Sequence, residues 1–196
     1  MSKQTWKPGN MLYPLPAVMV SSAAKTGAAN ILTIAWTGTI CSDPVMLYIS
    51  VKPERYSHHM IKETGEFVVN LTTTKLARAV DYCGVKSGKK VDKWKEMKLT
   101  KGKAETLQYA PIIEECPVNI ECKVTEVKEL GSHDMFMATV TAVNISDEYM
   151  NRNGKFELNK TGLLAYSHGE YLSLGRSLGK FGWSVRKTNN KRDTKI

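Results

Sequence analysis

The chain of 196 residues lacks several signatures that mark common classes of protein. No apolar run is long enough to cross a bilayer as a helix, so we expect no membrane-spanning segment and no membrane partner. The apolar stretch 12–24 contains Pro14 and Pro16 and has no processing pattern. We therefore expect a first strand from Leu15 to Ala24 and no signal peptide.

Cysteine and histidine are few, and their spacing favours neither disulfides nor a metal site. The four cysteines form no CxxC pair, so we expect reduced thiols and a cytoplasmic location for Cys41, Cys83, Cys116 and Cys122. The four histidines lack HxxxH spacing, so we predict no metal ligands. The adjacent pair His58 and His59 is expected on the exposed surface of a helix.

Motifs for nucleotide binding and for nucleophilic catalysis are also missing. We find no GxGxxG after a strand, no GxxxxGK[ST] and no GxSxG. Cys83 falls on the apolar face of a predicted helix, where a buried thiol is the commoner role. We therefore predict no catalytic side chain, and a nicotinamide cofactor, if used, would bind only transiently.

Acidic residues are outnumbered, which gives a formal charge of +9. The basic residues concentrate in the stretch Lys86–Lys103 and in the C-terminal tail from Arg186 onward. A nucleic-acid surface is one interpretation, and a solvated tail plus a site for anionic ligands is the other. We favour the second and expect no nucleic-acid partner, because aromatic residues are not interleaved with the basic ones.

The most informative stretch that is present runs from Asn30 to Ser57. Its pattern predicts two strands joined by the turn Cys41–Pro44, the second strand being Val45–Val51. A helix follows from Ser57 to Glu63, and Gly65 lies just past its end. Arg55 and Ser57 would thus sit where a strand end meets a helix N-terminus, a place suited to an anion such as phosphate.

The rest of the chain predicts further strands and few helices. We expect strands at Glu66–Leu71, Pro117–Val127, His133–Ile145 and within Gly162–Leu174, and a second helix from Thr72 to Cys83 that ends at Gly84. Hairpin spacing of this kind is typical of a mainly β protein, here a β-barrel with peripheral α-helices. We predict one domain at 11–187, an N-terminal arm at 1–10 and a basic C-terminal tail at 188–196.

One constellation could bind an anion and a flat ring. Arg55, Ser57 and Lys93 could hold a phosphate, and the backbone of Thr33–Thr39 could face a polar ring. Trp36, His133 and Tyr166 could stack or hydrogen-bond at its rim. The alternative is that Trp36 belongs to the core and Arg55 to a surface salt bridge.

Several motifs in the same order resemble those of the flavin reductase-like proteins, and within them the flavoredoxin branch. The similarity covers about Asn10–Lys187 and is carried by NILTIAWTGTICSDPVMLYISVKPERYS, GEFVVNL, DYCGVKSG (Asp81–Gly88), Asp92-Lys93-Trp94, APIIEECPVNIECKVTEV, LGSHDMF, AYSHGEY and SLGKFGWSVRK. The resemblance implies an FMN-binding split barrel that forms a homodimer, with FMN near the subunit interface.

The resemblance also implies which residues hold the cofactor. The ring-binding segment falls on Asn30 and on the backbone of Ala35, Trp36, Thr37 and Thr39. The phosphate-binding positions fall on Arg55, Ser57 and Lys93, and two residues from later strands, His133 and Tyr166, line the flavin. The flavin itself would supply the hydride and electron chemistry, which agrees with the missing acid and base.

Three functions follow from these expectations. The first is an oxidoreductase that takes a hydride from NADH or NADPH and passes electrons to free flavin, an iron centre or another acceptor. The second is a flavoredoxin-type carrier, in which bound FMN shuttles electrons between protein partners without a nicotinamide site. The third is a basic binding module with a degenerate flavin site, against which the intact set Arg55, Ser57 and Lys93 argues.

Overall fold

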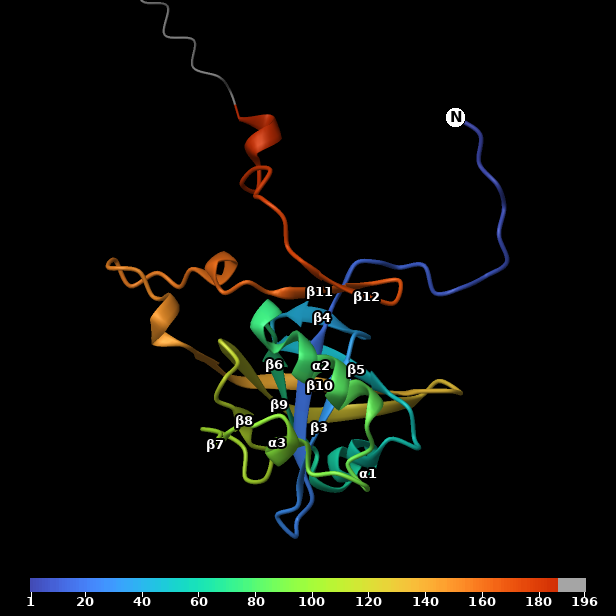
Figure 1. The fold of residues 1–196 in the computed structure, drawn as a ribbon, viewed down its shortest axis with the longest axis vertical. Coiled ribbons are helices and arrows are strands. Elements are labelled where there is room, and N and C mark those ends of the chain that lie inside the picture. Colours follow the sequence, from blue (N-terminus) through green and yellow to red (C-terminus); the bar gives the residue numbers. More distant parts are fainter. Residues whose placement is uncertain (187–196) are drawn as a thin grey trace, which may run out of the picture.

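A curved antiparallel sheet of seven strands forms the centre of the computed structural model, which describes residues 1–186 (Figure 1). The strands follow the spatial order β3 (Ala29–Ile34), β2 (Val18–Ala23), β6 (Glu66–Leu71), β9 (Val118–Glu129), β10 (Asp134–Ile145), β5 (Val45–Val51) and β4 (Thr37–Ser42). The predicted tail at 188–196 and Lys187 lie outside the described residues.

Two small sheets and short helices flank the central sheet. One small sheet has the order β1 (Leu15–Pro16), β11 (Leu164–Ser167), β12 (Glu170–Ser173), and the other pairs β7 (Lys101–Gly102) with β8 (Ile112–Ile113). The helices are α1 (Tyr56–Thr64), α2 (Ala77–Val85) and α3 (Lys93–Glu96), with 3₁₀ turns η1 (Thr74–Leu76), η2 (Asp147–Tyr149), η3 (Leu158–Lys160) and η4 (Trp183–Val185). The prediction of a mainly β fold with peripheral helices is confirmed.

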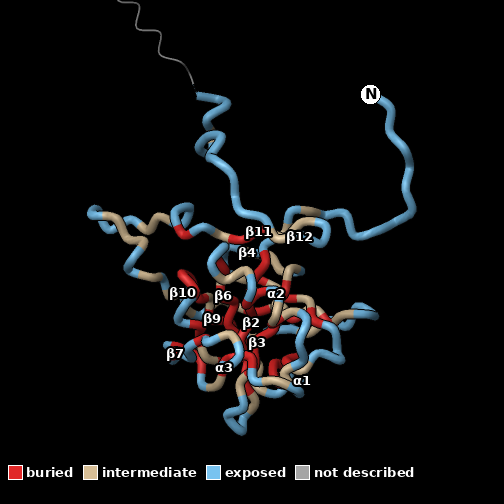
Figure 2. Tube along the Cα trace, in the orientation of Figure 1, coloured by how far each residue is buried: buried red, intermediate tan, exposed pale blue. Residues whose placement is uncertain are grey.

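The two larger hydrophobic cores of the described residues lie on opposite faces of the sheet. Alternate residues of a strand point to opposite faces, so Val18 and Val20 join the core inside the curved sheet while Met19 joins a second core under α2 and α3. Every residue of β2 is therefore buried. Figure 2 shows the buried residues gathered along these central strands, whereas the N-terminal arm and the last described residues before 187 are exposed.

The prediction of one continuous strand from Asn30 to the turn at Cys41 is wrong, because the chain changes its partner strand at Trp36. β3 pairs with β2 at one edge of the sheet, and β4 pairs with β5 at the other edge. Ala35 and Trp36 bridge the two edges, and the amide of Ser50 donates to the carbonyl of Trp36 at 2.9 Å. The alternating pattern continues across this break, so the pattern alone could not reveal it.

Four other element boundaries also differ from prediction. The predicted first strand splits into β1 and β2, which belong to different sheets, and the final stretch forms the hairpin β11–β12 rather than one strand. The second helix begins at Ala77, because Thr72 accepts from the amide of Leu164 and Thr73 bridges to Leu163. Gly84 lies inside α2 and does not end it.

Gly84 is needed for close packing. A Cβ at this position would lie 3.3 Å from the Cβ of Thr33 on β3. The hydroxyl of Thr33 also donates to the carbonyl of Val80 at 2.5 Å, which holds α2 onto the sheet. In contrast, Gly65 ends α1 as predicted, with φ of 68° and its amide donating to Ile61.

Two buried carboxylates hold the long connection between α3 and β9. Glu121 accepts from the amides of Glu105 and Thr106 at 2.8 and 2.7 Å, and Glu66 accepts from the amide of Tyr109 at 2.8 Å. Burial by itself raises the pKa of Glu121, but the hydrogen bonds from Thr106, Glu105 and Asn144 outweigh burial and lower it. The sequence pattern did not predict that these two carboxylates anchor the connection.

The expectation of an exposed histidine pair is wrong for one member. His59 is exposed, but His58 is 7% exposed and its Nε2 lies 2.8 Å from the carboxylate of Asp134. Helix α1 packs against the sheet on this side, so the partner that buries His58 comes from β10, 76 residues later in the chain.

Candidate functional site

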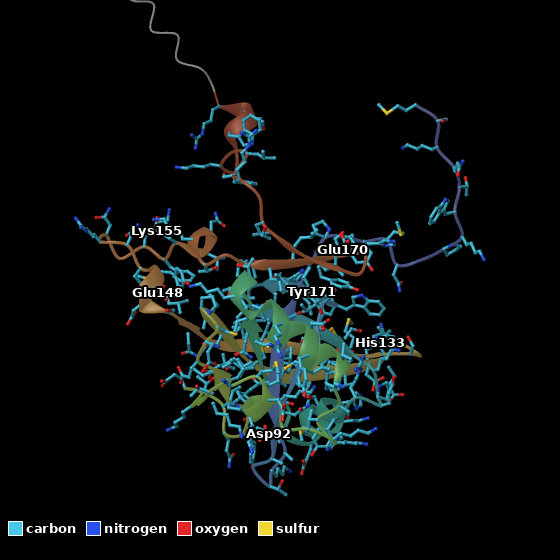
Figure 3. All side chains as sticks on the ribbon, viewed as in Figure 1. Asp92, His133, Glu148, Lys155, Glu170 and Tyr171 are labelled. Atoms are coloured by element: carbon cyan, nitrogen blue, oxygen red, sulfur yellow. The ribbon has the colours of Figure 1, made fainter. Side chains whose placement is uncertain are left out.

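A cavity of about 420 Å³ opens where β3 passes into β4. Its walls come from the Ala35–Trp36 bridge, the end of β5, helix α2, the start of β10 and the hairpin β11–β12. Figure 3 labels His133 and Tyr171, which come from the last two of these parts. The cavity therefore lies where the chain changes its partner strand, because Ala35 and Trp36 belong to neither the β2–β3 pair nor the β4–β5 pair.

Aromatic rings line this first cavity. The rings of Trp36 and His133 lie 4.5 Å apart between centroids, and those of Tyr166 and Tyr171 lie 5.6 Å apart. Trp36 is 38% exposed, so it is not a core residue. Four rings around a cavity of this size favour a flat, apolar-faced ligand with polar edges.

Burial and nearby charges shift the pKa of two of these aromatic side chains, His133 and Tyr171. Burial lowers the pKa of His133, and the positive charges of Lys52 and Arg55 lower it further, while Glu54 opposes them. Burial raises the pKa of Tyr171, and the neighbouring carboxylate of Asp81 adds to that effect. The neutral imidazole of His133 is thereby favoured beside the cations of this cavity.

A second cavity of about 240 Å³ adjoins the first, and both are lined by Leu32 and Arg55. Lys93 lines it with a side chain that is only 2% exposed. Its Nζ donates to the carbonyls of Ile31 and Cys83 at 2.7 and 2.8 Å. Burial lowers the pKa of Lys93 to about 8, and the nearby Arg55 adds to this shift, whereas Cys83 opposes it.

The second cavity is lined by the cations of Arg55, Lys86 and Lys93 and by one carboxylate, that of Glu54, which pairs with Lys52 at 3.9 Å. Among residues 1–186, neither Lys93 nor Arg55 belongs to an ion pair. Arg55 instead donates from Nη1 to the carbonyl of Gly84 at 3.1 Å. A buried ammonium without a counter-ion is costly. The second cavity is therefore suited to a bound anion.

The N-terminus of α1 lies against the same cavity. Arg55 is the N-cap residue, and no side chain caps the helix. Asn30 donates from Nδ2 to the hydroxyl of the fully buried Ser57 at 2.9 Å. The first amides of a helix lack partners within the helix and carry partial positive charge, so they add to the attraction for an anion.

The structure brings most of the predicted site residues together. Ala35, Trp36, His133 and Tyr166 line the first cavity, Asn30 and Lys93 line the second, and Arg55 lines both. Ser57 lines neither cavity, but its hydroxyl accepts from Nδ2 of Asn30, which lines the second. Thr37 and Thr39 line neither cavity: the hydroxyl of Thr37 donates to Tyr48 at 2.6 Å, and Thr39 is exposed on β4.

Several lining residues were not predicted from the sequence. They include Ser50, Lys52, Asp81, Lys86, Ser87, Gly88 and Tyr171. All seven lie within motifs that carry the family resemblance, but no chemistry in those motifs themselves points to a ligand. Tyr171 depends on the hairpin β11–β12, which was not predicted.

Within the described residues, no group of three or more His, Cys, Asp and Glu side chains is arranged to hold a metal ion. Within the same part of the chain, none of the helices is long and apolar enough to traverse a bilayer.

Comparison with known proteins identifies the class to which this fold and site belong. Residues 11–175 match the family model described as flavin reductase like domain. The chain belongs to the flavin reductase-like family.

Solved structures agree with this assignment. Flavoredoxin of Desulfovibrio vulgaris (Miyazaki F) is 26% identical with a TM-score of 0.87, covering 94% of this chain and 100% of that one. Flavoredoxin from Methanosarcina acetivorans is 29% identical with a TM-score of 0.83 and the same coverage. A Shewanella frigidimarina protein with a split barrel domain is 16% identical and covers 87% of this chain and 86% of that one, with a TM-score of 0.77. The predicted split barrel is confirmed.

Proposed function

We propose that this chain binds FMN, with the ring in the first cavity and the phosphate in the second, and acts as an oxidoreductase. The observation that carries the proposal is the pair of cations without carboxylate partners, Lys93 and Arg55, beside an aromatic cavity. The names of the neighbouring flavoredoxins point to the same class of ligand.

The residues fit such a cofactor. A phosphate dianion needs fixed cations and N–H donors, which Arg55, Lys93 and the start of α1 would supply. Asn30 and Ser57 would position one another at this end through their 2.9 Å hydrogen bond. The ring would lie in the first cavity beside Trp36 and the tyrosines, with main-chain groups of Ala35 and Trp36 near its polar edge.

Bound FMN would accept a hydride from NADH or NADPH and deliver electrons to free flavin or another acceptor. The chain would orient the ring, and the neutral His133 would leave the charge of the cavity to Arg55 and Lys52. No side chain is assigned as a general acid or base. This function agrees with the family to which the chain belongs.

The second candidate is an electron carrier that exchanges electrons with a protein partner and has no nicotinamide site. The similarity to two flavoredoxins over 94% of the chain supports it. An anaerobic NADH titration of the FMN-loaded protein separates the two. Bleaching of the flavin absorbance would support the reductase. Reduction by dithionite but not by NADH or NADPH would contradict it and leave the carrier.

We further propose a homodimer in a reducing compartment such as the cytoplasm. An apolar cavity of about 450 Å³ beside Trp36 is lined by large side chains, and three of them, Met11, Leu12 and Leu130, are more than half exposed. A second copy would cover this surface and lie next to the proposed ring position. All four cysteines are free thiols, which supports a reducing environment.

A further inference from the structure

One stretch of the chain carries the net positive charge of the described residues. Residues 86–103 contain eight lysines and two carboxylates, whereas the other described residues contain sixteen lysine or arginine side chains and sixteen carboxylates. Seven of the eight lysines are exposed, and we call them the lysine patch: Lys86, Lys89, Lys90, Lys95, Lys98, Lys101 and Lys103. The excess charge is therefore a local feature of one surface.

The fold gathers these lysines around the short helix α3. Lys89 and Lys90 precede α3 and Lys101 follows it, yet all three line one cavity. The Nζ of Lys101 lies 5.4 Å from the ring centroid of Trp94, whose buried side chain anchors α3 to the core. Figure 1 shows α3 and β7 in the lower part of the molecule, away from the arms at the two ends of the chain.

The carboxylates of the same stretch do not neutralise the patch. Asp92 is the N-cap of α3, and its carboxylate accepts from the amides of Trp94 and Lys95 at 3.0 and 3.3 Å. Within residues 1–186 neither Asp92 nor Glu96 belongs to an ion pair, and neither does any lysine of the patch. The charge of the patch is therefore available to an anionic surface.

Lys98 has a backbone conformation that is unfavourable for a side chain. Its φ is 54°, in the left-handed region where glycine or asparagine is usual. It directly follows Met97, the C-cap of α3, at a position where glycine commonly ends a helix. Glycine would relieve the strain but would remove the charge. Strain of this kind points to a role for the side chain outside the fold itself.

The composition of the patch favours a protein partner over a nucleic acid or a membrane. All of its cations are lysines, without the planar guanidinium fork that suits phosphates. The aromatic residue of the stretch, Trp94, is 5% exposed and cannot stack on a base. Leu99 is buried and Met97 is half-buried, so neither can enter a bilayer. Carboxylates on a protein surface are the complement that this patch fits.

The patch begins at the rim of the proposed flavin site. Val85 lines the first cavity and is 70% exposed, and the next residue, Lys86, lines the second cavity. A protein that covers the patch would therefore also cover the edge of the ring cavity. Opposite charges speed association, and complexes that exchange electrons have small and transient interfaces.

We propose that the lysine patch is the docking surface for an acidic redox protein, whose Asp and Glu side chains surround its redox centre. The inference rests on the proposed function, because the partner needs the flavin for electron exchange. A reductase would deliver electrons to the docked protein, and a carrier would also receive them there.

The experiment measures binding of the FMN-loaded, full-length chain to two acidic probes, a 2Fe–2S ferredoxin and a flavodoxin. The basic cytochrome c is the reference. Surface plasmon resonance gives the Kd and the association rate at about 50 and about 300 mM NaCl. We expect at least one acidic probe to bind and cytochrome c not to bind. The Kd of the acidic probe should rise roughly tenfold or more between the two salt concentrations.

Lys95→Glu/Lys98→Glu is the test variant, because neither lysine lines the two cavities of the proposed flavin site. The matched control, Lys75→Glu/Lys155→Glu, makes the same change of charge at exposed lysines outside the patch, and Figure 3 shows Lys155 well away from Asp92. We expect the test variant to raise the Kd for the acidic probe roughly tenfold or more, mainly through slower association, and the control less than about threefold. Both variants should bind FMN as the wild type does.

Lys98→Gly is a second variant that does not depend on the folding of the first. It should unfold at a higher urea concentration than the wild type, because glycine accepts the left-handed conformation. It should nevertheless bind the acidic probe more weakly, by roughly twofold to threefold, because one cation is lost. A stabilised variant that docks less well separates the role in docking from the role in the fold.

The proposal is overturned if neither acidic probe binds the wild-type chain, or if the test and control variants have equal effects. Tighter binding of a single-stranded RNA, or of phosphatidylserine vesicles, than of either acidic probe at the same salt concentration would also overturn it. FMN binding without docking removes the docking surface alone. A chain that binds no FMN loses the proposed function, and the redox role of the patch fails with it.

Discussion

Nε2 of His58 and the carboxylate of Asp134 lie 2.8 Å apart in the interior, and each residue adjoins a residue of the candidate site. His58 follows Ser57 at the anion end, and Asp134 follows His133 at the ring end. The pair joins the start of α1 to the start of β10. One buried contact therefore links the two ends of the site.

Loss of this contact should affect both stability and ligand binding. Asp134→Ala leaves a buried imidazole nitrogen without its partner, so we expect the free energy of unfolding to fall by about 1–3 kcal/mol. Urea unfolding measures this change, with the exposed Asp147→Ala as the control. FMN should also bind more weakly to the folded variant. Equal stability of the two variants would show that the pair contributes nothing.

Flavin affinity should fall at alkaline pH. The pKa of Lys93 is lowered to about 8 by burial, so the ligand-free chain loses this cation as the pH rises through 8. A bound phosphate favours the charged form, and the Kd for FMN should therefore rise by up to about tenfold per pH unit above 8. Fluorescence titrations from pH 6.5 to 9.5 measure the slope.

Lys93→Met is the matched control for this pH dependence. It should bind FMN more weakly at pH 7 and show a flat profile between pH 8 and pH 9.5, because methionine carries no titrating group. A variant profile as steep as that of the wild type would assign the titration to another group.

Removing one end of the ligand should separate the two halves of the site. Riboflavin has the ring of FMN but no phosphate. Arg55→Ala should weaken FMN by roughly tenfold or more, because a charge-assisted hydrogen bond contributes about 1.5–3 kcal/mol. It should weaken riboflavin much less, because Arg55 lines the ring cavity but riboflavin has no phosphate. Similar losses for both ligands would place Arg55 away from the phosphate.

Trp36→Ala should have the complementary effect. We expect it to weaken FMN and riboflavin alike, by roughly threefold to tenfold, because an aromatic contact contributes about 0.5–1.5 kcal/mol. Trp6→Ala is the control, since Trp6 is 77% exposed in the N-terminal arm and lines none of the cavities of the site. An unaffected flavin affinity in Trp36→Ala would remove this ring from the proposed site.

The buried Glu121 should stabilise the fold in a way that depends on pH. Its pKa is lowered from 4.5, so its contribution is complete above pH 4.5 and is lost as the pH falls through the lowered pKa. Glu121→Gln should therefore cost about 1–3 kcal/mol at pH 7 and much less near pH 3. Urea unfolding at both values tests this, and a constant difference would contradict it.

The proposed dimer predicts a single substitution that breaks it. Leu130→Glu places a charge on the exposed apolar cavity beside Trp36, and should shift the chain from dimer to monomer at micromolar concentration. Multi-angle light scattering measures the mass. Leu158→Glu, at an exposed apolar position on η3, should leave the mass unchanged. A wild-type chain that is monomeric under these conditions would exclude the dimer.

The sequence by itself determined the class of fold, the places of most strands, the end of α1 at Gly65, and the position of Arg55 and Ser57 at a helix start. These features are local, because they depend on alternation, on turn residues and on a glycine in the left-handed region. The basic residues and the missing catalytic motifs also directed attention to an anionic ligand rather than to a catalytic side chain.

Only the tertiary structure decided which of these residues share a cavity. The break at Trp36 arises because β3 and β4 lie at opposite edges of one sheet, and no local pattern records the partner of a strand. Lys93 lies among the carbonyls of Ile31 and Cys83, and His58 meets Asp134, because packing brings distant segments together. The charge state of a side chain depends on its burial and on its neighbours, and both are set by the whole fold.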